Sequence, residues 1–176
     1  MGVVGIIYVL YGYSMSFGSE NVGGIIANPF EKFGLAGTDT IINPFGYEGY
    51  GNIPELAFVG FQLTFAVITV ALISGAVADR MKFAAWALFV PLWLTVVYAP
   101  VAHWVFAFDS GDVKGGWIAN ELGALDFAGG TVVEISSGAS ALALALVIGK
   151  RVGWKRDPMR PHNLPAVLLG AGLLWF

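Results

Sequence analysis

Two carboxylates close together in one apolar stretch are the side chains most able to do chemistry in this chain. Glu134 lies near the middle of the run GGTVVEISSGASALALALVIG (129–149), and Asp126 stands just before that run in LDFAGGTVVE. A carboxylate inside a segment long enough to cross a bilayer costs roughly 2.5 to 3.5 kcal/mol on insertion scales, so it usually faces a bundle interior or a water path. The pattern favours proton transfer or ion passage.

Each carboxylate also has a structural interpretation. Asp126 can accept hydrogen bonds from backbone N–H groups around Gly129 and complement the helix dipole, or it can help attract a cation at a pore mouth. Glu134 is either a protonated side chain bonded to a neighbouring carbonyl or part of a proton relay, and burial would favour its protonated form. On an ideal helix the two would be about 12 Å apart along the axis and about 80° apart around it.

Aromatic side chains gather near the ends of two other apolar segments. Phe61, Gln62 and Phe65 lie in FQLTF, where the two phenylalanines are four residues apart and share a helix face. Trp104 and Phe106 lie in HWVF. Aromatic residues at such places are typical of an interfacial belt or of lipid-facing packing, but their π faces can also bind a cation.

The composition predicts that membrane-spanning helices position these residues. The chain is 57% hydrophobic and 12% charged, whereas a soluble domain carries about 25% charged residues. At about 20 residues a crossing, we find five apolar segments: 2–17, 56–78, 84–107, 128–149 and one that starts near Leu164. We expect one all-α transmembrane domain over 1–176, truncated at both ends, with the third segment kinked at Pro91 and Pro100.

The basic residues predict the orientation of the helices. Seven of the nine Lys and Arg residues fall in loops 79–83 and 150–162, which are two crossings apart and therefore on the same side. The positive-inside rule makes that side cytoplasmic. Loops 18–55 and 108–127 hold two basic and nine acidic residues, so we expect them to be extracellular.

Several kinds of chemistry are excluded or gain no support. The chain has no cysteine, which excludes disulfide and thiol chemistry, and its formal net charge of −3 gives no indication of a nucleic-acid partner. Neither His103 nor His162 has a second histidine at ligand spacing, so we expect no metal; we expect His103 to pack or to form a hydrogen bond. The sequence predicts a protein that is not an enzyme and has no cofactor.

Five runs of the sequence together resemble the ammonium transporter (Amt/Mep/Rh) family in order and spacing. They are YGYSMSFG, GFQLTFAVITVALISGAVADRMKF, YAPVAHWVF, GALDFAGGTVVEISSG and IGKRVGW followed by PHNLPAVLLGAGLLWF. The resemblance covers essentially the whole chain. It implies roughly the second to sixth helices of an eleven-helix protein of the cell membrane, normally a homotrimer with one pore per subunit. It also implies transport of ammonium or ammonia, contact with membrane lipid and a cytoplasmic PII-type regulator.

The resemblance implies roles for the aromatic residues and for Asp126. Phe65 matches one of the phenylalanines that gate the outer pore, with Gln62 one turn before it. Asp126 matches the aspartate near the outer recruitment site. Phe106 falls on a position that is often Trp and contributes to the outer cation site, and Trp104 is the alternative residue for part of that role.

Glu134 is the main departure from the family pattern. It falls on the position of the first of the paired pore histidines, and a glutamate there resembles some members of the Mep branch. The implied mechanism is recruitment at the outer aromatic site, deprotonation, passage of ammonia through an apolar pore and a proton relay through Glu134 and a partner beyond Phe176. An ammonium sensor on the same scaffold and a neutral gas channel of the Rh type are alternatives.

Overall fold

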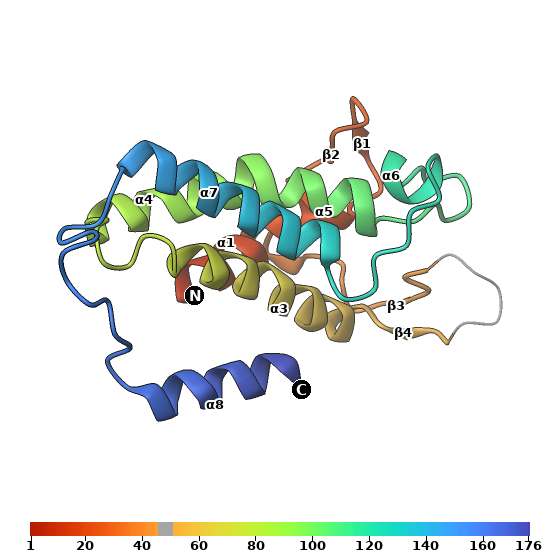
Figure 1. Cartoon of the computed structure of the whole chain (residues 1–176). Helices are drawn as coiled ribbons and strands as arrows, with labels where there is room; N and C mark the ends of the chain where they lie inside the picture. Colours follow the sequence, from red (N-terminus) through yellow and green to blue (C-terminus); the bar gives the residue numbers. More distant parts are fainter. Residues whose placement is uncertain (46–50) are drawn as a thin grey trace.

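Long apolar helices form a bundle, with short strands in one loop (Figure 1). The computed structural model describes residues 1–45 and 51–176. In this part of the chain, three helices are long and apolar enough to cross a membrane, Glu55–Ser74, Phe83–Phe106 and Gly130–Ile148. The shorter apolar helices Gly2–Phe17 and Leu164–Trp175 correspond to the first and fifth predicted segments. The predicted all-α membrane fold is confirmed.

Three of these helices contain a π-helical stretch. The first consists of α1 (Gly2–Ile7), η1 (Tyr8–Gly12) and α2 (Tyr13–Phe17), and α3 (Glu55–Ser74) follows it. The next consists of α4 (Phe83–Trp93), η3 (Leu94–Tyr98) and α5 (Ala99–Phe106). The last two are η4 (Gly130–Ile135) continuing into α7 (Ser136–Ile148), and α8 (Leu164–Trp175).

The π-helical stretch η3 lies between the two prolines predicted to disturb this helix. Pro91 lies inside α4, and Pro100 stands in the first turn of α5. Proline has no N–H to donate and its ring crowds the preceding turn. Just before Pro100, the Ala99 N–H bonds the Leu94 carbonyl, five residues back. The interruption therefore takes the form of a widened π turn, a known site of bending in helices.

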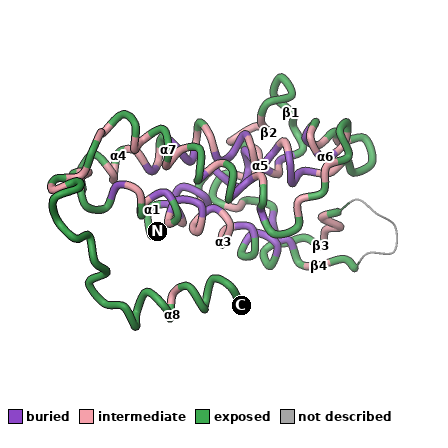
Figure 2. The backbone as a smooth tube through the Cα atoms, viewed as in Figure 1, coloured by how far each residue is buried: buried purple, intermediate pink, exposed green. Residues whose placement is uncertain are grey.

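The core lies between the first helix, α3 and the helix from α4 to α5, with the start of η4 packed against them (Figure 2). Tyr8, Leu94 and Val132 are fully buried there. The Trp93 Nε1–H donates to the Ser140 hydroxyl at 2.9 Å and joins α4 to α7. Helix α8 lies apart from the bundle and is exposed along almost its whole length (Figures 1 and 2).

Two helix boundaries differ from the predicted ones by more than one residue. The second helix ends at Ser74 instead of 78, because turns occupy 75–80. The fourth begins at Gly130 instead of 128, because Gly129 has φ 93° and ψ 19°, a left-handed conformation that glycine adopts without steric cost. Asp126 therefore precedes the helix, and the offset from Glu134 expected for an ideal helix is wrong.

The loops between the helices contain short elements of their own. In loop 18–55, β1 (Asn21–Val22) pairs antiparallel with β2 (Ile26–Ala27), and β3 (Ile41–Ile42) pairs antiparallel with β4 (Ile53–Pro54). A 3-10 turn, η2, covers Phe33–Leu35, and loop 108–127 contains α6 (Trp117–Asn120). These loops lie at the same end of the bundle, which we call the loop end (Figure 1).

Glu31 fastens the strand-bearing loop at the loop end. Its carboxylate accepts from the Ser19 hydroxyl at 2.6 Å and from the backbone N–H groups of Ser19 and Glu20 at 3.0 Å each. Burial alone would raise the pKa of Glu31, but these hydrogen bonds outweigh it and hold the pKa below its ordinary value. This contribution to stability is present above the unfolded-state pKa and is lost as the pH falls through the folded-state pKa.

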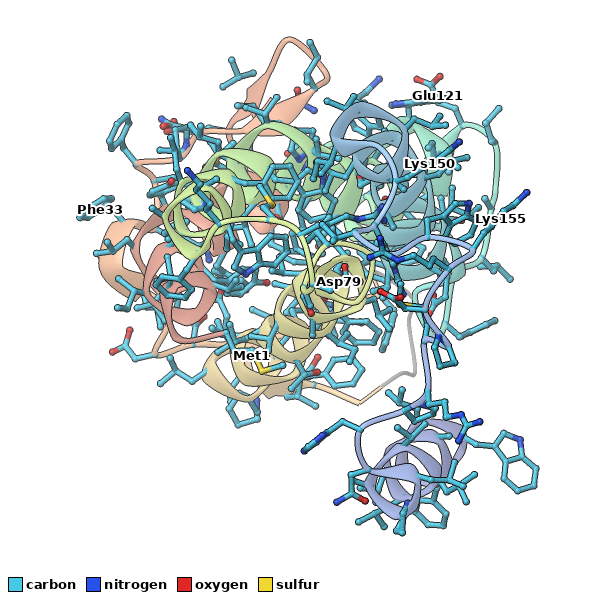
Figure 3. The ribbon with its side chains drawn as sticks, turned by 60° about the vertical axis from the view of Figure 1, so that its left-hand side comes forward. Met1, Phe33, Asp79, Glu121, Lys150 and Lys155 are labelled. Atoms are coloured by element: carbon cyan, nitrogen blue, oxygen red, sulfur yellow. The ribbon has the colours of Figure 1, made fainter. Side chains whose placement is uncertain are left out.

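Charged residues join the two basic loops at the opposite end of the bundle. Asp79, after α3, pairs with Arg151, after α7, at 3.0 Å. The Arg80 guanidinium donates to the Gly149 carbonyl and to the Ala76 carbonyl. Figure 3 shows Asp79 beside the segment that carries Lys150. The two loops predicted to share one side therefore meet at one end.

Candidate functional site

Several of the predicted site residues meet in a hollow of about 360 Å³ at the loop end, which we call the aromatic hollow. Gln62 from α3, Phe106 from α5 and Asp126 line it together. The wall also contains the rings of Phe45, Phe58, Phe61, Phe108 and Phe127. Its size is within the range of small-ligand sites, and its wall combines aromatic faces with one carboxylate.

Phe65 lies directly behind this wall. Its ring meets the edge of Phe61 with centroids 5.0 Å apart and that of Phe106 with centroids 5.5 Å apart. Edge-to-face pairs of this kind contribute about 0.5–1.5 kcal/mol beyond burial. Because Phe65 is one turn further along α3 than Phe61, its ring lies deeper between the helices than the wall of the hollow.

Asp126 both lines the hollow and builds the turn that precedes η4. Its Oδ1 accepts the Gly129 N–H at 2.7 Å, and its Oδ2 accepts those of Thr131 at 2.8 Å and Val132 at 3.2 Å. The predicted capping bonds are confirmed. The side chain is half-buried. Its negative charge therefore stands at the helix N-terminus and on the wall of the hollow at once.

A Gly129→Ala substitution is expected to disturb Phe65. A Cβ at Gly129 would lie 2.7 Å from Cγ2 of Val133 and 3.2 Å from Cδ1 of Phe65. The left-handed backbone adds about 1–2 kcal/mol of strain for an L-residue. We expect a lower Tm for the purified full-length protein and slower methylammonium uptake.

Gly130→Ala is the matched control, because a Cβ there meets nothing within 4 Å. If Gly129→Ala behaved like Gly130→Ala in both the Tm and the uptake rate, the left-handed turn would not control the position of Phe65.

Glu134 is exposed, and it does not line the aromatic hollow. In the described part of the chain, its carboxylate has no hydrogen bond or ion pair, so the alternative of a carbonyl-bonded side chain gains no support there. Its neighbours Val132, Val133 and Ser137 are buried. Glu134 therefore occupies the opposite, uncovered face of this helix, and the burial expected from the sequence is not provided by the described residues.

Trp104 points away from the aromatic hollow. Its Nε1–H donates to the Ile25 carbonyl at 2.8 Å, and its ring lies 6.1 Å from that of Trp117. It is therefore fixed against the β1–β2 hairpin, whereas Phe106, two residues later, lines the hollow. The alternative that gave Trp104 part of the cation-site role is not supported by this geometry.

Two polar residues at the loop end, His103 and Glu55, are buried. His103 is 1% exposed and its Nδ1 lies 3.0 Å from the Ser16 carbonyl, which confirms the predicted packing role. Glu55 is 2% exposed and bonded to Lys32, although from the sequence we counted it only as a loop charge. Its position directly before the apolar run of α3 was the sequence feature that could have indicated a buried role. Within the described ranges, no group of three His, Asp or Glu side chains could hold a metal ion.

Apolar helices of membrane length define a helical membrane protein, and its loop end contains a hollow of aromatic rings with one carboxylate. The chain belongs to the ammonium transporter family: the pattern of the Ammonium Transporter Family matches residues 1–176. An ammonium transporter of Mycobacterium tuberculosis (strain ATCC 25618 / H37Rv) is 55% identical over 191 residues, covering 100% of this chain and 39% of that protein. One of Bacillus subtilis (strain 168) is 47% identical over 178 residues, with the same coverage of each chain.

Solved structures of related proteins have the same fold. The crystal structure of Saccharomyces cerevisiae Mep2 matches with a TM-score of 0.78 and 31% identity, over 99% of this chain and 36% of that chain. A structure of a Sensor Amt Protein matches with a TM-score of 0.79 and 25% identity, over 98% of this chain and 41% of that chain. The predicted family is confirmed, and this chain spans about two fifths of the length of its curated relatives.

Proposed function

We propose that this chain forms the entry side of an ammonium transporter. An ammonium ion is recruited at the aromatic hollow, is deprotonated there, and crosses as ammonia while its proton travels separately. The observation that carries this proposal is the convergence of Gln62, Phe106 and Asp126 on one hollow, with Phe65 directly behind it.

The magnitudes separate recruitment of the cation from its passage. A cation–π contact contributes about 0.5–2 kcal/mol, which is enough to favour a cation at the mouth. Moving a bare ion of this size into a low-dielectric interior costs on the order of tens of kcal/mol. Aromatic contacts therefore cannot carry an ammonium ion between the helices, whereas neutral ammonia avoids most of this cost. The proton then needs a polar route.

Glu134 is the residue that we assign to the proton relay. It is a titratable side chain within the membrane-length helix Gly130–Ile148, on the face that the described residues leave uncovered. The curated relatives are longer than this chain, and in a protein of their length further helices would face Glu134. The family resemblance implies that its relay partner is a histidine. A titrating relay also favours net charge movement over the neutral gas channel of the Rh type.

We also propose how the loops are oriented in the membrane and how the protein assembles. Loops 79–83 and 150–162 face the cytoplasm, because they carry the excess of Lys and Arg. Loops 18–55 and 108–127, and with them the aromatic hollow, face the outside of the cell membrane. The family supports a homotrimer with lipid around it, and a cytoplasmic PII-type regulator that would meet the basic end.

A Phe106→Leu substitution tests the cation site. Leucine keeps an apolar side chain at the wall of the hollow but removes the π face. We expect the KM of methylammonium uptake to rise by about 2- to 30-fold, the equivalent of about 0.5–2 kcal/mol. Uptake is measured with labelled methylammonium in cells that lack their own ammonium transporters, and it is normalised to the amount of protein in the membrane.

Trp104→Leu serves as the control in the same assay, since Trp104 contacts the hairpin instead of the hollow. Its KM should stay at the wild-type value. A raised KM for Trp104→Leu together with an unchanged KM for Phe106→Leu would reverse the assignment of the cation site.

An ammonium sensor is the second candidate, and the likeness to the Sensor Amt Protein favours it. A sensor built on this scaffold would bind ammonium at the same hollow without net uptake. Wild-type protein that binds ammonium, yet gives cells no methylammonium uptake above background, would select the sensor and contradict the transporter.

A further inference from the structure

A buried carboxylate outside the aromatic hollow holds three segments of the loop end together. Glu55 is the first residue of α3 and is 2% exposed. Its Oε1 accepts from the Tyr13 hydroxyl at 2.8 Å and from the Lys32 ammonium at 2.5 Å. Its Oε2 accepts from the Thr40 hydroxyl at 2.8 Å, and its own N–H donates to the Thr40 carbonyl at 2.9 Å.

The environment of Glu55 offsets the cost of burying its charge. A buried charge is strongly unfavourable unless it is paired and hydrogen-bonded. Both carboxylate oxygens are bonded, one partner is a cation, and the N-terminus of α3 favours a negative charge. Tyr13 belongs to α2, whereas Lys32 and Thr40 belong to loop 18–55. The carboxylate therefore fixes α2, α3 and this loop relative to one another.

Apolar packing is incomplete around Glu55. A second hollow of about 390 Å³ lies between the loop and the helices, and its lining includes Lys32, Glu55, Phe58 and Phe106. Elsewhere the loop packs on the bundle through Leu35 and Ile42, and the Lys32 N–H donates to the Ser14 hydroxyl at 2.9 Å. The polar bonds of Glu55 therefore attach the loop to the bundle at a place where the apolar packing is incomplete.

Helix geometry connects Glu55 to the aromatic hollow. Phe58 and Gln62 lie three and seven residues after Glu55, on the same face of α3. Both line the aromatic hollow. The Phe58 ring meets that of Phe17 on α2 with centroids 5.0 Å apart, so it also shares the α2–α3 contact that Glu55 fixes. A rotation or slide of the first turn of α3 would move both residues together.

We propose that Glu55, through its pair with Lys32, is a positioning residue for the cation site: it sets the rotation of α3 and thereby the places of Phe58 and Gln62. This inference rests on the proposed function, because it assigns a role in cation capture. It adds a residue that does not touch the cation.

The first test separates affinity from transport rate. A positioning defect in a binding site costs about one to two orders of magnitude. We therefore expect Glu55→Gln to raise the KM for methylammonium by about tenfold, with Vmax per molecule in the membrane within about twofold of wild type. Glu121→Gln is the matched control, because Glu121 is an exposed glutamate in loop 108–127, also at the loop end. Its KM should not change.

A double-mutant cycle with Lys32→Met tests whether the pair acts as a unit. Each single change leaves one charge without its partner, so the double variant should have a KM no higher than the worse single variant. Independent effects that multiply in the double variant would contradict the positioning pair. If Vmax and the amount of the variant in the membrane both fell while KM stayed unchanged, Glu55 would have a folding role alone. That outcome would also overturn the proposal.

Thiol labelling tests the attachment without relying on transport. The chain has no cysteine, and Thr38, in the loop held by Lys32 and Thr40, is 2% exposed. In open membrane fragments, a cysteine replacing Thr38 should react about tenfold faster when Glu55→Gln is also present, since opening of the loop governs access. Equal labelling rates would overturn the inference. Faster labelling in a protein with no methylammonium uptake would reject the proposed function while keeping the attachment role.

Discussion

An Asp126→Ala variant is expected to lose methylammonium transport by about a hundredfold or more, equivalent to about 2.7 kcal/mol. Alanine removes all three acceptor bonds from the Gly129, Thr131 and Val132 N–H groups and the negative charge on the hollow. Hydrogen bonds to a charged acceptor contribute about 1.5–3 kcal/mol each. The turn before η4 should then open, and the hollow should lose its shape. The measurement is initial uptake per molecule in the membrane.

Two further variants make the result specific. Asp126→Asn keeps one acceptor oxygen but turns an NH₂ group toward a backbone donor, so its uptake should fall between alanine and wild type. Asp109→Asn is the control, because Asp109 accepts one N–H, from Gly115 at 2.7 Å, in the same loop region but does not line the aromatic hollow. Wild-type uptake by Asp126→Ala would exclude both the structural and the cation-attracting role.

Glu134→Gln is expected to have the second large effect, on proton movement. Glutamine keeps the size of the side chain and removes its titration. We expect ammonium-evoked current to fall by about tenfold or more, in keeping with the 10²–10⁴-fold contributions of positioned proton-transfer groups in catalysis. The Tm should stay near wild type, because in the described part of the chain the carboxylate bonds no other group. Detergent-purified protein gives the Tm, and proteoliposomes give the current.

A stability loss would change the interpretation of this variant. If Glu134→Gln lowered the Tm as much as Asp126→Ala does, Glu134 would be a structural residue in the full-length protein. An unchanged Tm together with a lost current would separate the relay role from folding.

The helices and the family could be predicted from the sequence, because they depend on local composition and on contiguous motifs. Apolar runs of membrane length leave few alternatives to helices in a bilayer. The capping role of Asp126 was also predictable, since an aspartate three residues before a glycine at a helix start has nearby N–H donors. The left-handed turn at Gly129 was not predicted, because the predicted helix began at 128 and continued through Gly129.

Side-chain directions at the loop end could not be predicted from the sequence. Trp104 and Phe106 are two residues apart on a helix and point about 200° apart around its axis, so only one of them can face a given site. The choice depends on the β1–β2 hairpin, whose Ile25 carbonyl binds the Trp104 indole. The role of Glu55 was missed for a similar reason. Its partners Tyr13 and Lys32 are 42 and 23 residues away in the sequence.

The surroundings of Glu134 could be predicted only in part from the sequence. The sequence marks it as a costly charge in an apolar segment, and the structure places it on the uncovered face of η4. Its proton-relay role therefore requires a facing partner in the full-length protein. The assignments at the aromatic hollow, by contrast, concern described residues and can be tested one by one.

The most direct test of deprotonation and relay through Glu134 is the current evoked by an ammonium pulse on proteoliposomes containing the full-length protein. The wild type should give an inward current of positive charge with a clear dependence on pH, and Glu134→Gln should lose both the current and that dependence. Ammonium uptake by the wild type without any current, or a Glu134→Gln current with the wild-type amplitude and pH dependence, would contradict deprotonation followed by a relay through Glu134.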